Sequence, residues 1–143
     1  MESKVGTVIG FDFGTVWTGI AVGVTLTAQA RPLNAIKSIN QKPNWLAIEC
    51  LLKEWQPQKL IVGLPRSMIN DYHPMTAKAL KFSRQLEGRF KVPVELVDER
   101  LTTREAYEMA IESKQHKTKQ QIDSIAAMLI TESWLRGDKI TTR

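Results

Sequence analysis

The spacing of hydrophobic and polar positions changes several times along the chain, and each spacing predicts one type of element. Residues 5–12 and 17–24 are rich in Gly, Val and Ile, and the short FGTVW segment between them fits a hairpin. Between Asn44 and Trp55 the apolar residues recur at helical spacing, with Asn44 suited to cap the helix and Pro57 just beyond its end. The chain after this helix alternates between short apolar runs and helical patterns.

The whole pattern predicts the element order β-β-β-α-β-α-β-α-α. Strands are expected at 5–12, 17–24, 31–39, 59–65 and 93–100, and helices at 44–55, 74–90, 102–112 and 122–135. Hairpin-connected strands followed by alternating helices and strands are typical of an α/β fold with a mixed sheet. We therefore predict one domain, residues 1–143, whose five-stranded sheet has three antiparallel strands, then parallel strands, and helices on both faces.

The composition narrows the class of protein. With 143 residues, of which 43% are hydrophobic and 24% charged, the chain suits a soluble globular protein. Its single cysteine, Cys50, excludes an intramolecular disulfide and a cysteine-cluster zinc site, and we expect it to be buried or half-buried in its helix. The sequence shows neither a membrane-spanning apolar run nor a signal peptide, so we expect a cytoplasmic protein without a membrane partner. The net charge of +5 is compatible with a polyanionic partner.

Acidic residues stand at the ends of three predicted elements. Asp12 ends the first strand, Asp98 and Glu99 end the fifth, and Asp123 lies in the first turn of the last predicted helix. In mixed sheets of this type ligands bind outside the carboxyl ends of the parallel strands, where the strand order reverses. Because neighbouring residues of a strand point to opposite faces, only one of Asp98 and Glu99 can face a site beside Asp12.

Three carboxylates at one edge would repel one another unless a cation neutralised them. Mg²⁺ binds carboxylate oxygens and completes its coordination with water and phosphate oxygens, so a metal site for phosphoryl chemistry is one interpretation. Each acid also has a structural interpretation. Asp12 could cap the hairpin turn, Asp98 or Glu99 could pair with Arg100, and Asp123 could stabilise the helix dipole.

Four segments in order carry a family resemblance: IGFDFGT with TGIAVG, then IVGLP, then VDERLTT, then DSIAAMLI. They resemble the YqgF family of bacterial proteins, also described as RuvX, which has the RNase H-like fold. The resemblance runs from about Thr7 to Trp134 and so covers nearly the whole chain. The glycines inside it, such as Gly19 and Gly23, suit either close approach of a ligand or packing against a large neighbour.

The resemblance implies a hydrolase, a nuclease that depends on Mg²⁺ or Mn²⁺. Its implied substrate is the 5′ end of precursor 16S ribosomal RNA, with ribosomal particles as further partners, and branched DNA by analogy with Holliday junction resolvases. Its implied catalytic and metal-binding residues are Asp12, Glu99 and Asp123. In related resolvases the fourth strand supplies an acid, whereas here this strand ends in VGLP without one. The chain also departs from its own family's usual pattern, because the loop at 66–71 lacks the glycine-containing turn.

Several polar residues near these acids are candidates for contact with nucleic-acid phosphates. They are Thr15, Thr18, Arg66, Arg100 and, in the polar loop at 114–120, Lys114, Lys117 and Lys119. Lysines on such a loop would bind the backbone without distinguishing bases. A solvated surface is the alternative interpretation for each of them.

Two other functions are open at this point. The chain could be a non-catalytic factor that binds nucleic acid or the ribosome and retains an inherited site. The GFDFGT hairpin also resembles the first phosphate-binding motif of actin-like ATPases, although 143 residues would form only one of their two lobes. The sequence leaves open RNA or DNA as substrate, Mg²⁺ or Mn²⁺ as metal, internal or terminal cleavage, and monomer or homodimer.

Overall fold

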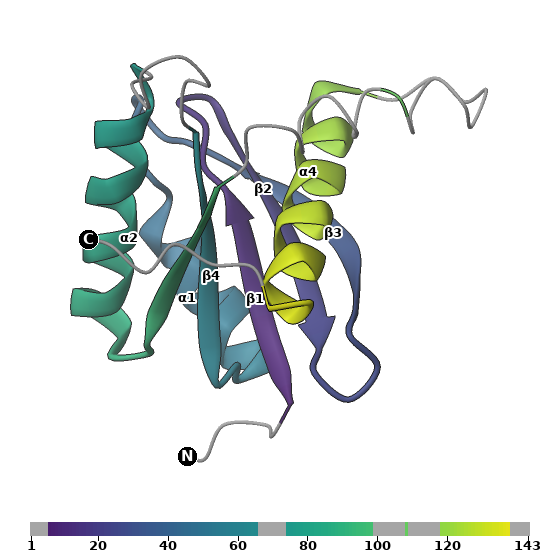
Figure 1. The fold of residues 1–143 in the computed structure, drawn as a ribbon. Helices are drawn as coiled ribbons and strands as arrows, with labels where there is room; N and C mark the ends of the chain where they lie inside the picture. Colours follow the sequence, from purple (N-terminus) through teal and green to yellow (C-terminus); the bar gives the residue numbers. More distant parts are fainter. Residues whose placement is uncertain (1–5, 66–73, 99–107, 109–117, 138–143) are drawn as a thin grey trace.

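The computed structural model describes residues 6–65, 74–98, 108 and 118–137. Its sheet has the strand order β3-β2-β1-β4-β5, and Figure 1 shows β1 at its centre. The strands are β1 (Thr7–Asp12), β2 (Trp17–Val24), β3 (Gln29–Lys37), β4 (Lys59–Leu64) and β5 (Val94–Asp98). The β1–β2 and β2–β3 pairs are antiparallel, whereas β1–β4 and β4–β5 are parallel. The predicted mixed sheet is confirmed.

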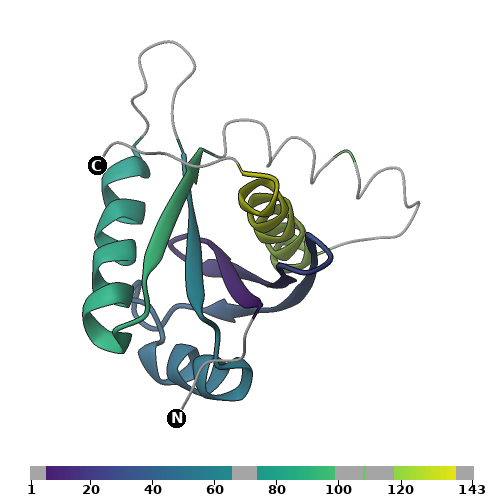
Figure 2. The same cartoon turned by 60° about the horizontal axis from the view of Figure 1, so that its bottom comes forward.

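Helices cover both faces of this sheet, as Figures 1 and 2 show. One face packs against α1 (Trp45–Trp55) and α2 (Thr76–Phe90), and the other against α4 (Lys119–Leu135). Most of the helix predicted at 102–112 lies outside the described residues, apart from Glu108, which is helical. None of the helices in the described ranges has the length and hydrophobicity that a membrane crossing would need.

Strand alternation assigns each side chain to one of the two faces. In β1, Ile9 and Phe11 belong to the core under α1 and α2, whereas Val8 packs with the residues under α4. In β5, Leu96 lies on the α1/α2 face and Val97 on the α4 face. Asp12 therefore has the register of Val8 and belongs to the α4 face of β1.

The α1 helix begins as predicted, because the Asn44 side chain accepts a hydrogen bond from the Ala47 N–H (3.1 Å). Its inner face is made by Ile48 and Leu52, which are one turn apart and buried. Cys50 lies between them in the sequence and is exposed, so the prediction that it is buried or half-buried is wrong. Two residues correspond to about 200° of helical rotation, which turns Cys50 away from the core.

The α4 helix begins at Lys119, three residues before the predicted start at 122. Thr118 caps it: the Thr118 hydroxyl oxygen accepts from the Gln121 N–H (3.3 Å), and the Gln121 side chain accepts from the Thr118 N–H (2.8 Å). Asp123 therefore lies in the second turn of the helix and not in the first. The interpretation of Asp123 as a carboxylate that stabilises the helix dipole from the first turn is wrong.

Glycines in β1 and β2 bring α4 close to the sheet. A Cβ atom on Gly10 would overlap the Thr131 hydroxyl, and one on Gly23 would lie 2.8 Å from Thr131 Cγ2. Thr131 is fully buried, and its hydroxyl donates to the Ala127 carbonyl oxygen (2.7 Å). Close packing of α4 against the sheet therefore explains why residues 10 and 23 are glycines.

Candidate active site

The carboxylate of Asp12 lies at the end of the central strand, on the face that α4 crosses. In the β1–β2 ladder Asp12 is paired with Gly19. Gly19 in turn contacts α4, because a Cβ atom there would overlap the Asp123 carbonyl oxygen and lie 2.8 Å from the Ser124 nitrogen. Asp12 and the main chain of Asp123 are thus both direct neighbours of Gly19. These two predicted site residues are brought to the same edge of the sheet.

A buried hydrogen bond holds α4 against β2 at this point. The Ile20 N–H donates to the Ser124 hydroxyl oxygen (3.2 Å), and Ser124 is 2% exposed. The β2–β3 register shifts between Thr18 and Ile20, which places an irregularity beside this contact. The sequence interpretation missed Ser124, although its position next to a candidate acid is a signal that could have pointed to it.

Asp123 is buried and paired. Its residue is 8% exposed, and its Oδ1 atom accepts from Lys119 Nζ at 2.6 Å. The lysine side chain is itself 64% exposed, so the ammonium group approaches the carboxylate from the solvent side. The two residues are four positions apart on α4, so this ion pair also stabilises the helix.

The strand alternation decides to which face of the sheet Asp98, at the end of β5, belongs. Asp98 is paired with Leu64 and has the register of Val94 and Leu96, which places it on the α1/α2 face, opposite to Asp12. Glu99 lies outside the described residues. Among the residues that the structure describes, no group of three or more His, Cys, Asp or Glu side chains could hold a metal ion.

The predicted phosphate-binding residues fall into different places. Thr15 is exposed in the connection after β1, whereas Thr18 is 4% exposed and has the register of the α1/α2 face. Lys119 pairs with Asp123. The other four, Arg66, Arg100, Lys114 and Lys117, lie outside the described residues. The geometry therefore brings Lys119 to Asp123, whereas Thr18 has the register of the opposite face of the sheet.

Solved structures of Holliday junction resolvases share this architecture. RuvC of Thermus thermophilus in complex with a Holliday junction substrate superposes with a TM-score of 0.55 at 18% identity, over 93% of this chain and 98% of that chain. The Fowlpox virus Holliday junction resolvase gives a TM-score of 0.56 at 15% identity, over 91% and 98% of the two chains. The molecule thus has the RuvC-like, RNase H-like fold of the resolvases.

The chain belongs to the RuvX family, since residues 6–137 match the family described as "RuvX: Holliday junction resolvase". It is 51% identical over 132 residues to a "Putative pre-16S rRNA nuclease" of Saccharophagus degradans, covering 91% of this chain and 93% of that one. It is 49% identical over 131 residues to the Escherichia coli O157:H7 protein of the same description, covering 90% and 95%. The resemblance found in the sequence motifs is confirmed.

Proposed function

We propose that this protein is a divalent-metal-dependent nuclease that hydrolyses phosphodiester bonds at the edge formed by Asp12 and Asp123. The observation that supports it most is the contact of Gly19, the ladder partner of Asp12, with the main chain of Asp123. This contact gathers two acids from residues more than 100 positions apart in a chain of the RuvX family. Carboxylates that meet at a strand end suit metal-assisted phosphoryl transfer.

In this proposal Asp12, Glu99 and Asp123 hold Mg²⁺ or Mn²⁺. The choice of Glu99 follows the family resemblance, and it fits the register of Asp98, which belongs to the α1/α2 face, opposite to Asp12. The bound metal would activate a water molecule and stabilise the leaving oxygen. Hard carboxylate oxygens suit both ions.

Lys119 has two partners in the proposal. In the structure its ammonium neutralises Asp123. A metal ion bound to that carboxylate would repel the ammonium, and the exposed lysine would then be available for a substrate phosphate. Arg66, Arg100, Lys114 and Lys117 are kept as proposed phosphate contacts.

The proposed substrate is the 5′ end of precursor 16S ribosomal RNA, because the two relatives described above carry that substrate class in their descriptions. The resolvases that share the fold support branched DNA as a second substrate. The ribosomal RNA substrate fits a protein that is cytoplasmic and acts on ribosomal particles. The match over residues 6–137 favours this family over an actin-like nucleotide-binding lobe.

The test compares the native protein with Asp12→Asn on a 16S precursor and on a four-way DNA junction, each with Mg²⁺, Mn²⁺ or a chelator. We expect cleavage by the native protein with metal, and none by Asp12→Asn or with chelator. Asp98→Asn is the matched control, since it removes one acid at the same edge but from the other face, and it should retain cleavage.

Cleavage that persists in Asp12→Asn would contradict the proposed site. A native protein that binds the precursor but never cuts it, with either metal, would establish the non-catalytic factor instead. A precursor cut faster than the junction supports the ribosomal substrate, and the reverse order supports branched DNA.

A further inference from the structure

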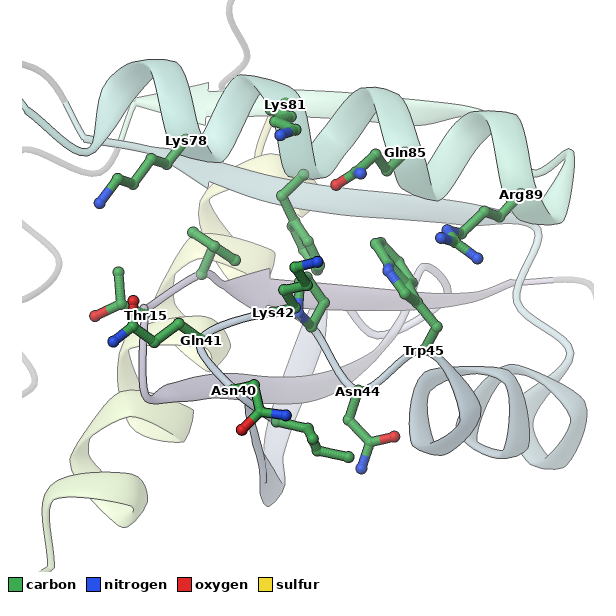
Figure 3. Close-up of a pocket in the computed structure, with 14 residues that line it drawn as sticks. Thr15, Asn40, Gln41, Lys42, Asn44, Trp45, Lys78, Lys81, Gln85 and Arg89 are labelled. Atoms are coloured by element: carbon green, nitrogen blue, oxygen red, sulfur yellow. The ribbon is translucent and has the colours of Figure 1, made fainter.

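A basic groove lies on the face of the sheet opposite to the proposed active site. It has a volume of about 790 Å³ and is formed by α2, by the segment 39–45 and by the connection after β1. Figure 3 shows its walls: along α2 lie Lys78, Lys81, Gln85 and Arg89, and facing them lie Thr15, Asn40, Gln41, Lys42, Asn44 and Trp45. The described lining contains four cations and no Asp or Glu. Its chemistry suits an extended polyanion.

The polar side chains of α2 form one line along the groove. Lys78, Lys81, Gln85 and Arg89 are three or four residues apart, which places them on one side of the helix. Eleven residues separate the first from the last, so the line is about 16 Å long. This arrangement suits several consecutive phosphates of a strand better than one isolated phosphate group.

The floor of the groove is aromatic. Phe13 and Trp45 both stack on Phe82, with ring centroids 4.8 and 5.7 Å away. The Arg89 guanidinium lies over Trp45, 4.3 Å from the ring centroid, so this cation is held in place at the far end of the line. Phe82 is buried and Trp45 is covered by Arg89, so the planar groups left for a base are the half-buried Phe13 and the Arg89 guanidinium. A positively charged groove with such groups is typical of proteins that bind single-stranded nucleic acid, because unpaired bases offer their faces for stacking. A duplex hides those faces.

One end of the groove adjoins the proposed active site along the chain. Phe13 and Thr15 line it, and they directly follow Asp12, which ends β1. Lys78 lies in the first turn of α2, which begins beyond the carboxyl end of β4. A strand that passes the Asp12 edge can therefore cross the rim at Thr15 and continue along α2 towards Arg89.

We propose that this groove binds a single-stranded segment of the nucleic acid that is cleaved at the Asp12 edge. The proposal rests on the proposed nuclease function for the identity of the strand. Binding itself requires no cleavage, so it can be tested without metal. Lys42, Lys78 and Lys81 supply the charge and are all exposed, which makes their removal tolerable for folding.

The experiment measures binding of a fluorescent 12-nucleotide oligouridylate in chelator, by anisotropy at several salt concentrations. The groove variant carries Lys42→Ala, Lys78→Ala and Lys81→Ala. We expect its affinity to fall about tenfold or more, and the slope of log affinity against log salt to decrease by about 2, because three phosphate contacts are lost. Thermal unfolding checks that the variant is folded.

The matched control variant carries Lys53→Ala, Arg84→Ala and Arg136→Ala, which also removes three exposed cations. Arg84 is the sharpest comparison, because it lies on α2 but does not line the groove. The control should keep most of the native affinity. An equal loss in both variants, or native affinity in the folded groove variant, would overturn the proposal.

Two further arms test the kind of ligand. A 12-base-pair RNA duplex that bound more tightly than the single strand, or a polyglutamate peptide that competed as well as the oligonucleotide, would overturn the assignment to single-stranded nucleic acid. Failure of the groove is also separable from failure of the nuclease. If the protein binds the oligonucleotide through the groove but never cuts, the groove proposal stands and the nuclease proposal fails. If it cuts without groove-dependent binding, only the groove proposal fails.

Discussion

The two faces of the sheet are built from different residues, and they differ in what they leave at the surface. On the α4 face, Gly10, Gly19 and Gly23 let the helix lie close to the strands, and at Gly19 its main chain is in contact. On the α1/α2 face, large side chains such as Phe11 and Phe82 fill the space, with their ring centroids 5.6 Å apart. Close approach on the α4 face brings Asp12 and the main chain of Asp123 to one end of the sheet, whereas on the other face a basic groove lies between α2 and the segment 39–45.

This difference teaches that the position of the carboxylates depends on backbone packing more than on side-chain contacts. Asp12 and Asp123 belong to elements distant in the sequence, and the residue that connects them, Gly19, has no side chain. The groove depends instead on exposed lysines that contribute little to the core. Substitutions on the two faces should therefore have different consequences for stability and for function.

The largest effect is expected at Gly19. In Gly19→Ala the new Cβ atom meets backbone atoms of Asp123 and Ser124, which cannot rotate away, so the free energy of unfolding should fall by about 3 kcal/mol. Gly88→Ala in α2 is the control, because in the described part of the chain no atom beyond its own helical neighbourhood lies within 4 Å of the Cβ position, and it should gain about 0.5 to 1 kcal/mol. Urea denaturation measures both. Equal stability of the two variants would contradict the close packing of α4.

A smaller effect is expected at the two helix caps. Thr118→Ala and Asn44→Ala each remove a side chain that accepts a hydrogen bond at a helix start, and each should cost about 1 kcal/mol in denaturation experiments. Thr118→Ala also loosens the turn before Asp123, so it should slow cleavage. Native cleavage in a Thr118→Ala protein that has lost this stability would contradict the link between the cap and the site.

The smallest effect on stability is expected at Lys119. Because the lysine is exposed, Lys119→Ala should change the free energy of unfolding by about 0.5 kcal/mol or less. Removing its positive charge from Asp123 should strengthen binding of Mn²⁺ about fivefold. Lys53→Ala, which breaks an exposed pair with Glu49, is the control and should leave the Mn²⁺ affinity unchanged. Weaker Mn²⁺ binding in Lys119→Ala would mean that the lysine assists the metal site.

The hydrophobic pattern was sufficient to predict the sheet, because strand periodicity and hairpin spacing are local properties of the chain. It also placed Asp12 at the end of the first strand, which is the central strand of the sheet. The start of α4 was missed because its capping residues, Thr118 and Gln121, lie in a polar run that looks like a loop. The exposure of Cys50 was not predicted, because a single thiol within a helix is by default expected to be buried or half-buried.

The groove could not be predicted from the sequence, because its walls come from three separate segments. The lysines of α2 have the spacing of an ordinary solvated helix face, and Lys42 lies in an irregular segment. Similarly, the sequence limited the fifth strand to one inward-facing acid without deciding between Asp98 and Glu99. In the folded sheet Asp98 has the register of Leu96, on the α1/α2 face, and Glu99 lies outside the described residues.

The most direct test of the account is a titration of Mn²⁺ into the native protein, Asp12→Asn and Asp98→Asn, followed by calorimetry. The account predicts that the native protein binds the ion, that Asp12→Asn loses about tenfold or more in affinity, and that Asp98→Asn binds as the native protein does. Native affinity in Asp12→Asn, or an equal loss in Asp98→Asn, would contradict a metal site on the α4 face.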